Sequence, residues 1–243
     1  MATLASRDAF YWVLRGTLDL TLWGGELVCD EELPRHQPAV FVANHAGALG
    51  PIGVAASLPV RLHPWVIGDM LDPEKAGPYL EQDFVRPALH LPPSLARLVA
   101  AALSRLTVPL LRSIGCIPVW QDRELLKTYR LSGDALAAGR SLLIFPEDPT
   151  LPINPRTAMR PFKTGFAQLG SLYHGRAGGD LRFYPVAVHR ARRRVELGRP
   201  ALYNSLNREG AERRRVAHVL ESAIAEMLTA GDRRLNAEIQ RIG

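Results

Sequence analysis

Residues 39–45 read Ala-Val-Phe-Val-Ala-Asn-His, and this stretch decides the class of fold. Five apolar residues in succession are typical of a strand that is covered on both faces. Asn44 and His45 end the run, and Gly47 and Gly50 follow, which predicts a tight loop. Ligand sites in open α/β sheets lie beyond the carboxyl ends of the strands. The sequence therefore predicts an α/β protein with a polar site at Asn44 and His45.

Short apolar segments on either side of this stretch predict further strands, and helical periodicity separates them. The predicted strands are Glu26–Cys29, Pro64–Ile67, Cys116–Trp120, Leu142–Phe145 and Phe183–Val188. The predicted helical faces run from Leu95 to Leu106, ending before Pro109, from Leu125 to Leu136 and from Val216 to Leu228. This alternation indicates a largely parallel central sheet flanked by helices. Because no repeat or low-complexity linker interrupts the chain, we predict one domain over residues 1–243, with a core at about 39–188.

Helices are predicted at both ends of the chain. Residues 8–23 have a wide apolar face crowded with aromatic residues, so residues 1–24 are predicted to form an amphipathic helix. Such a helix packs on the domain or lies in a membrane interface, and both alternatives stay open. The clearest helical pattern predicts a second helix at about residues 207–230. Residues 36–60 contain no Asp, Glu, Lys or Arg, but their glycines and prolines argue against a membrane span.

The composition is that of a globular protein with a basic surface. The 243 residues carry a net charge of +6 and only two cysteines, Cys29 and Cys116. Few cysteines suit a reducing, cytoplasmic interior. The positive charge predicts an acidic partner, which is nucleic acid, anionic lipid headgroups or a phosphorylated substrate.

The segment from Phe145 to Gly165 resists assignment to a helix or a strand. It contains prolines at positions 146, 149, 152, 155 and 161, and proline removes the backbone donor that both elements need. A loop of this length inside a compact domain is typically functional or disordered. Because this loop directly follows a predicted buried strand, we favour function.

Two polar groups at predicted strand ends are candidates for chemistry. His45 is placed to act as a general base, although a lone histidine is equally often a satisfied core residue. Glu147 and Asp148 follow the strand Leu142–Phe145, where they can orient a histidine or accept hydrogen bonds from a substrate. The alternative for this pair is an ordinary Asx turn before Pro149.

Two further segments are weaker signals. Gly115-Cys116-Ile117-Pro118-Val119 leads to Arg123, and the planar guanidinium of an arginine at a strand exit suits phosphate oxygens. Tyr184-Pro185-Val186-Ala187-Val188 is an apolar strand with an early proline, which carries no functional signal by itself.

Taken in order, these blocks resemble the four motifs of the phospholipid/glycerol acyltransferase family, which includes glycerol-3-phosphate and lysophosphatidate acyltransferases. The blocks are Asn44-His45, Gly115 to Val119, Phe145-Pro146-Glu147 and Pro185 to Val188, and with the flanking helices the resemblance covers nearly the whole chain. It implies phospholipid biosynthesis with an acyl-CoA or acyl-carrier-protein donor as co-substrate, a glycerolipid acceptor, and no further cofactor or metal.

The resemblance also implies roles for single residues. It makes His45 the catalytic base and places the acceptor phosphate near Gly115 to Arg123. The substrate-binding residues that it implies are Asn44, Gly115, Arg123, Pro146, Glu147 and Lys163. The alternative is a protein of this fold that binds lipid without turnover.

Three positions depart from the family pattern. Gly50 stands where the family has an aspartate five residues after the histidine, Gln121 stands in place of an arginine, and Asp148 stands in place of a glycine. In serine proteases, loss of the carboxylate that orients the histidine lowers turnover by about 10⁴. We therefore expect another carboxylate to contact His45, with Asp148 preferred to Asp69, and we expect an aspartate at position 50 to point towards His45.

Other functional classes lack their sequence signatures. The chain has no Gly-x-Ser-x-Gly elbow, no phosphate-binding or dinucleotide-binding glycine loop and no His-Glu-x-x-His. The basic clusters at residues 190–194 and 213–215 are expected to contact anionic lipid, and no specific nucleic acid is expected. We therefore expect a cytoplasmic enzyme associated peripherally with the inner face of the membrane.

Overall fold

The structure is a computed structural model that describes residues 4–29, 33, 37–47, 49–120 and 124–242. The chain divides into two compact units, and each unit is assembled from two separate segments. The smaller unit comprises residues 1–12 and 63–132, and the larger one comprises residues 13–62 and 133–243. The prediction of one domain over residues 1–243 stays a prediction.

The larger unit contains a mostly parallel sheet. Its strands are β1 (Glu26–Cys29), β2 (Ala39–Ala43), β5 (Ser141–Ile144), β6 (Arg182–His189), β7 (Arg194–Leu197) and β8 (Ala201–Leu202). They lie in the order β1-β7-β6-β2-β5, with β8 beside β6. β2 runs parallel to both β5 and β6, and β1 runs parallel to β7, whereas β6 is antiparallel to β7 and β8. The predicted α/β class with a largely parallel sheet is confirmed.

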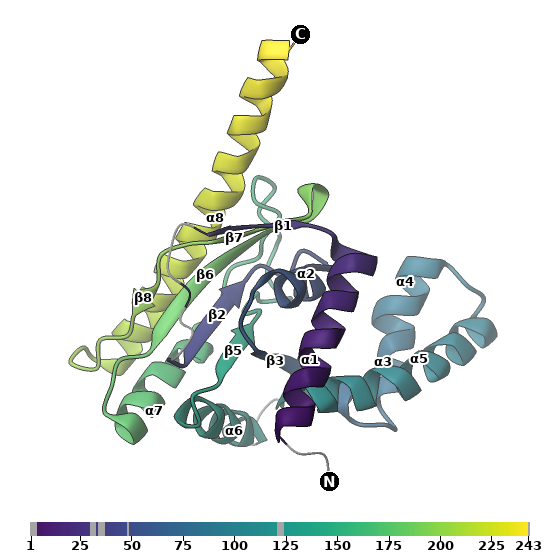
Figure 1. Ribbon diagram of the computed structural model, residues 1–243, viewed down its shortest axis with the longest axis horizontal. Helices are drawn as coiled ribbons and strands as arrows, with labels where there is room; N and C mark the ends of the chain where they lie inside the picture. The colour runs from purple at the N-terminus through teal and green to yellow at the C-terminus, as the bar shows by residue number, and fades with distance from the viewer. Residues whose placement is uncertain (1–3, 30–32, 34–36, 48, 121–123, 243) are drawn as a thin grey trace. The chain divides into compact units, whose positions relative to one another are not determined.

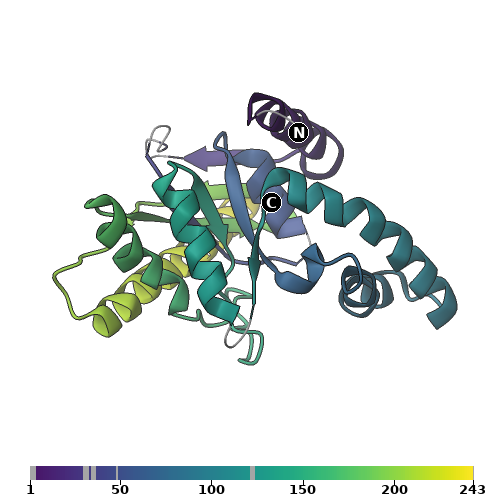
Figure 2. The ribbon, with the colours of Figure 1, turned by 90° about the horizontal axis from the view of Figure 1, so that it is seen from below.

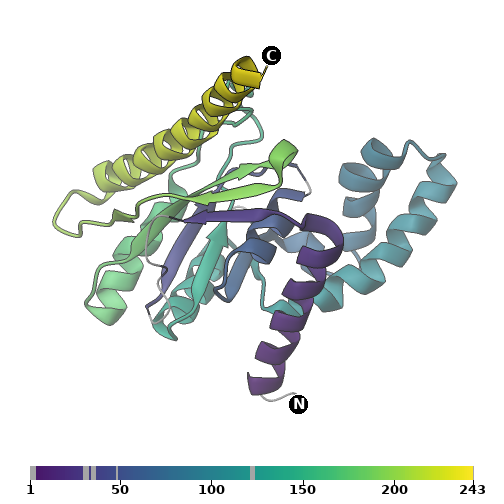
Figure 3. The ribbon, with the colours of Figure 1, turned by 45° about the horizontal axis from the view of Figure 1, so that its top comes forward.

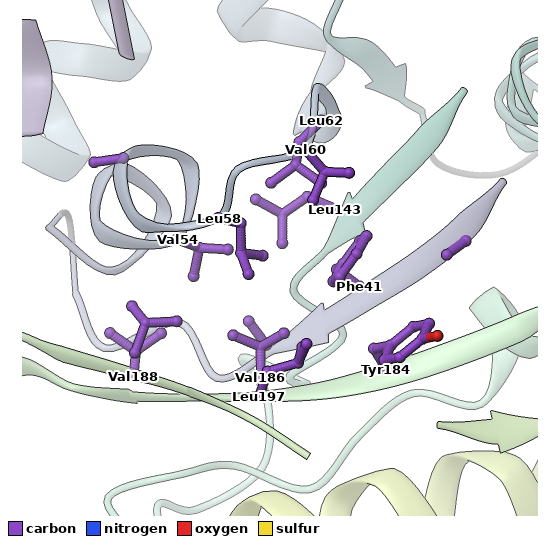
Figure 4. Packing of buried hydrophobic residues seen from close by; sticks show 14 of the residues in the cluster. Phe41, Val54, Leu58, Val60, Leu62, Leu143, Tyr184, Val186, Val188 and Leu197 are labelled. Carbon is purple, nitrogen blue, oxygen red and sulfur yellow. The ribbon is translucent and has the colours of Figure 1, made fainter. Parts of the chain in front are cut away.

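Helices cover both faces of this sheet (Figure 3). On one face, Phe41 stacks on Tyr184 with ring centroids 5.3 Å apart, and α2 (Leu49–Ser57) adds Val54 to the same core (Figure 4). On the other face, α8 (Glu209–Ile242) packs against β6 with buried residues that include Leu220. Because both faces are covered, every residue of β2 is buried.

The smaller unit consists mainly of helices. β3 (Leu62–Ile67) pairs in parallel with β4 (Ile117–Val119), and four helical elements and a 3₁₀ turn lie between them in the chain. These are η2 (Gly68–Leu71), α3 (Ala76–Leu80), η3 (Glu81–Val85), α4 (Arg86–Leu89) and α5 (Pro93–Ile114), which Figures 1 and 2 show. Leu80, Val85, Ala96 and Ala100 form the core of this helical group.

The ends of several elements differ from the prediction. α5 does not end at Pro109 but continues to Ile114, with Pro109 on an exposed position inside the helix. The N-terminal helix, predicted over residues 1–24, is α1 (Leu4–Leu18), and it finishes as a π-turn, η1 (Asp19–Trp23). The C-terminal helix α8 extends twelve residues beyond the predicted end at about residue 230.

Several elements have no counterpart in the sequence prediction, among them β7, β8, α3, α4 and α7 (Gln168–Ala177). β7 reads Arg-Val-Glu-Leu, and its apolar residues are buried while its charged residues are partly exposed. This alternation with a period of two is the ordinary signal of a strand, but it begins at Arg194, the last residue of the basic cluster that we assigned to the surface. α6 (Leu125–Ala137) matches its predicted helical face.

Candidate active site at the end of strand β2

Asn44 joins the end of β2 to the neighbouring strand β6. Its side-chain Nδ2 donates to the Val188 carbonyl at 3.2 Å, and its Oδ1 accepts from the Val188 amide at 2.7 Å. The side chain is buried, and both ends of the amide are paired with backbone. Asn44, which was predicted to bind substrate, therefore positions the loop that carries His45.

His45 follows with its imidazole at the carboxyl edge of the sheet. The ring lies edge-on to Phe145, with centroids 5.4 Å apart, and it is hydrogen-bonded to the backbone of Gly47. One side of the residue is exposed to solvent. Enclosure of the rest of the ring lowers the pKa of His45, and the charge of Glu147 and the Gly47 backbone raise the pKa by less. The imidazole is consequently neutral at pH 7, as a general base must be.

Glu147 connects the His45 loop to the proline-rich segment. Its Oε1 accepts from the His45 backbone amide at 2.7 Å, and its Oε2 accepts from the Arg160 amide at 2.8 Å. Residue 147 also forms an isolated β-bridge with Phe162, whose amide donates to Glu221 Oε2 on α8 at 2.9 Å. Glu147 therefore holds the backbone of His45 in place, and its two oxygens are already engaged by protein donors.

Asp148 does not supply the missing carboxylate by direct contact. Its Oδ1 accepts from the amide and the hydroxyl of Thr150 at 3.0 and 2.7 Å, and Lys163 Nζ lies 3.6 Å away. These bonds, chiefly the one from the Thr150 hydroxyl, lower the pKa of Asp148. The geometry is that of the Asx turn left open as the alternative.

Over the described ranges, no carboxylate is hydrogen-bonded directly to the imidazole of His45, and the expectation of a direct contact from Asp148, Glu147 or Asp69 is corrected, whereas contact through one water stays a prediction. The imidazole is instead hydrogen-bonded to the backbone of Gly47. Asp69 belongs to the smaller unit and lies 3.5 Å from Lys75 Nζ. Lys163 and Pro146 are joined by a backbone hydrogen bond of 2.8 Å, which places the predicted basic residue beside Asp148.

Gly50 is a glycine for a steric reason. It lies buried in the first turn of α2, and a Cβ added there would be 2.0 Å from the carbonyl oxygen of His45. The expectation that an aspartate at this position would point towards His45 is therefore wrong, because any side chain would collide with the backbone of the residue it should orient.

Arg190 lies beside the His45 loop, and the sequence analysis did not single it out. It begins η6 (Arg190–Arg192), directly after β6, and its Nη1 is 3.3 Å from the position that a Cβ of Gly47 would occupy. Gly47 has a φ of 71° and leaves this space open. The sequence placed Arg190 just after the predicted strand Phe183–Val188, and the parallel register of β2 with β6 in the structure brings the ends of both strands to one edge.

The predicted phosphate-binding region lies in a different part of the chain. Gly115 caps α5 in the smaller unit with a φ of 80°, and its carbonyl is 2.9 Å from His63 Nδ1, while its contact with substrate stays a prediction. Arg123 lies outside the described residues. Burial raises the pKa of the nearby Cys116 thiol to about 12, which keeps that cysteine protonated and unreactive.

Comparison with known proteins finds a similar fold among solved structures but no match by sequence. No protein-family model and no curated protein matches the sequence. Among solved structures, the fold is similar to that of the 1-acyl-sn-glycerophosphate (LPA) acyltransferase PlsC from Thermotoga maritima, with a TM-score of 0.53. The two sequences are 12% identical, and the match covers 91% of this chain and 82% of that one. The likeness establishes an acyltransferase-like fold.

Proposed function

We propose, from the acyltransferase-like fold, that the protein moves a fatty acyl group from a thioester donor to a hydroxyl of a glycerophosphate or lysophospholipid. Acyl-CoA and acyl-carrier protein are the candidate donors. The observation that carries the proposal is the position of the His45 imidazole at the end of the central strand, edge-on to Phe145, with the guanidinium of Arg190 beside the same loop. This pair provides a base and a cation at one sheet edge.

The reaction requires His45 to accept one proton from the acceptor hydroxyl and later to donate it to the leaving thiolate. His45 takes the proton from the acceptor hydroxyl while that oxygen attacks the thioester carbonyl. The tetrahedral intermediate then collapses, the C–S bond breaks, and the leaving thiolate receives the proton from the imidazolium. The products are an ester and a free thiol. The Gly47 backbone holds the imidazole in place of a carboxylate.

Arg190 is proposed to bind the phosphate of the acceptor. A guanidinium offers paired donors that match phosphate oxygens, and the family's arginine is replaced by Gln121 in this chain. Arg190→Ala should raise KM for lysophosphatidate about tenfold or more, with a smaller change in kcat.

The experiment measures acylation of lysophosphatidate, glycerol 3-phosphate and an uncharged monoacylglycerol by the purified protein, with each donor. We expect turnover with the phosphate-bearing acceptors and a loss of that preference in Arg190→Ala. Arg214→Ala, which alters an exposed arginine on α8, is the matched control. Equal KM values for wild type and Arg190→Ala would remove Arg190 from the site.

A second candidate function is lipid binding without turnover. The contact of the His45 imidazole favours this function, because the imidazole is hydrogen-bonded to the Gly47 backbone where the family uses a carboxylate. A wild-type protein that binds lysophosphatidate but transfers no acyl group from either donor would establish this alternative.

The pH dependence of kcat/KM should report the protonation of His45 directly. Because the neutral imidazole is the active form and burial lowers its pKa, the acidic limb of kcat/KM should lie at a lower pH than the titration of an ordinary histidine. The charge of Glu147 raises this pKa, so Glu147→Gln should move the acidic limb to still lower pH. A limb that stays in place in Glu147→Gln would show that another group titrates.

Peripheral association with the inner face of the membrane is proposed together with the lipid substrate. In the first helix and π-turn, Tyr11 and Trp23 are buried, whereas Phe10, Val13 and Leu20 are exposed. The segment therefore does both things left open by the sequence: it packs on the protein and presents apolar residues outwards. Deleting it would remove core residues, so point substitutions such as Leu20→Asp are the appropriate test.

A further inference from the structure

Helix α5 in the smaller unit has one buried and one exposed apolar face. The buried positions recur every four residues, and they are Ala96, Ala100, Ser104 and Val108. This face packs against α3 and η3. The outer face carries Leu95, Leu98 and Leu106, and the side chains of Leu98 and Leu106 are 68% and 73% exposed. Leu98, Ala102 and Leu106 are spaced four residues apart, so they form one stripe along the helix.

The neighbouring elements of the same helical group add to the exposed apolar surface. Phe84 on η3 and Leu89 on α4 are both exposed. Single exposed leucines are ordinary, but several large apolar side chains on one helix and its neighbours are typical of a binding surface.

The charge on α5 indicates what this surface binds. The helix contains Arg97, Arg105 and Arg112, and neither aspartate nor glutamate. Arg97 pairs with Glu81 on η3 at 3.7 Å, and Arg112 donates to the Leu71 carbonyl at 3.1 and 2.7 Å, so the exposed Arg105, next to Leu106, is the arginine that flanks the stripe. An arginine beside an apolar stripe suits an anionic lipid interface, where the leucines enter the acyl region and the guanidinium group meets a phosphate. A second copy of the same face is a poorer partner, because a twofold contact would bring arginines against arginines.

The contacts of α5 favour a helix that lies on the bilayer over one that crosses it. Among the described residues, α5 is the one helix that is long and apolar enough to span a membrane, and only 22% of its most apolar stretch is buried. However, its inner face is packed on α3, and the carbonyl of Gly115 at its end is held 2.9 Å from His63 Nδ1. A spanning helix would have to give up these contacts.

We propose that the exposed face of α5 is the surface by which the protein binds an anionic lipid bilayer. The helix rests in the interface, with Leu95, Leu98 and Leu106 below the headgroups. This surface contains none of the residues of the proposed active site and does not depend on acyl transfer, although it would bring a lipid-modifying enzyme to its substrate.

The test is co-sedimentation with phosphatidylglycerol vesicles and with neutral phosphatidylcholine vesicles. Wild type should bind phosphatidylglycerol at low salt and release it as salt rises. The double variant Leu98→Asp, Leu106→Asp should lower the ratio of bound to free protein by about tenfold or more, and Arg105→Glu should weaken binding to phosphatidylglycerol selectively. Leu126→Asp is the matched control, because that leucine is 76% exposed on α6 and should leave binding unchanged.

Each of the other results of the vesicle-binding experiment decides whether α5 is the membrane-binding surface. Equal vesicle binding by wild type and the double variant would overturn the proposal, and loss of binding in Leu20→Asp would in that case assign the contact to η1. If the double variant instead turns a dimer into a monomer in sedimentation, the face is an interface between copies. Thermal unfolding of every variant confirms that it is folded. His45→Ala should bind vesicles like wild type, so failure of the proposed chemistry leaves this test intact.

Discussion

His45→Ala is expected to lower kcat/KM for acylation of lysophosphatidate by about 10²- to 10⁴-fold, the range typical of removing a general base. The fold should tolerate the change, because the backbone amide of His45 keeps its bond to Glu147 and one side of the residue is already exposed. The measurement is steady-state acyl transfer, accompanied by thermal unfolding to show that stability is retained.

His218→Ala is the control for this variant, because His218 is an exposed histidine on α8. It should transfer acyl groups at the wild-type rate. If His45→Ala also retains wild-type activity while remaining folded, His45 is not the base and the proposed mechanism is wrong.

Gly50→Asp is expected to destabilise the protein and to add no activity. The new Cβ would lie 2.0 Å from the His45 carbonyl oxygen and 3.2 Å from the Ala46 side chain. Forcing atoms into so tight a contact costs about 3 kcal/mol or more in the free energy of unfolding. For a protein of this size the melting temperature should fall by about 6 to 12 °C.

Gly50→Ala isolates the steric effect, since it adds the Cβ without a charge. Its control is Gly175→Ala on α7, where a Cβ would have no atom within 4 Å. That change should be neutral or slightly stabilising, because alanine favours a helix. A Gly50→Asp protein that is as stable as wild type and more active would show that the aspartate of the family can be restored.

Local patterns in the sequence were sufficient to predict most of the strands of the central sheet. β1 and β2 have the predicted bounds, and β5 and β6 differ by a residue at their ends. These strands are short apolar runs, and burial on both faces is what such runs require. β7 was missed because its charged residues obscured a clear alternation, and the end of α5 was misplaced because an exposed proline can be accommodated near the end of a helix.

The candidate site was predictable in position but not in its contacts. His45 at the end of β2 and Glu147 after β5 follow from the positions of apolar strands, and parallel pairing of β2 with β5 brings them together. The sequence could not show that Glu147 holds backbone amides, that Asp148 is occupied by Thr150, or that Arg190 lies beside Gly47.

The sequence by itself determined the alternation of strands and helices and the residue types at each strand end, because periodicity and turn chemistry act between neighbours in the chain. The tertiary structure alone decided which polar groups meet. The bonds from Asn44 to Val188 and from His45 to Glu147 join residues more than a hundred positions apart, and they depend on strand order and register. The collision at Gly50 has the same origin, because it depends on how closely α2 approaches the carbonyl of His45.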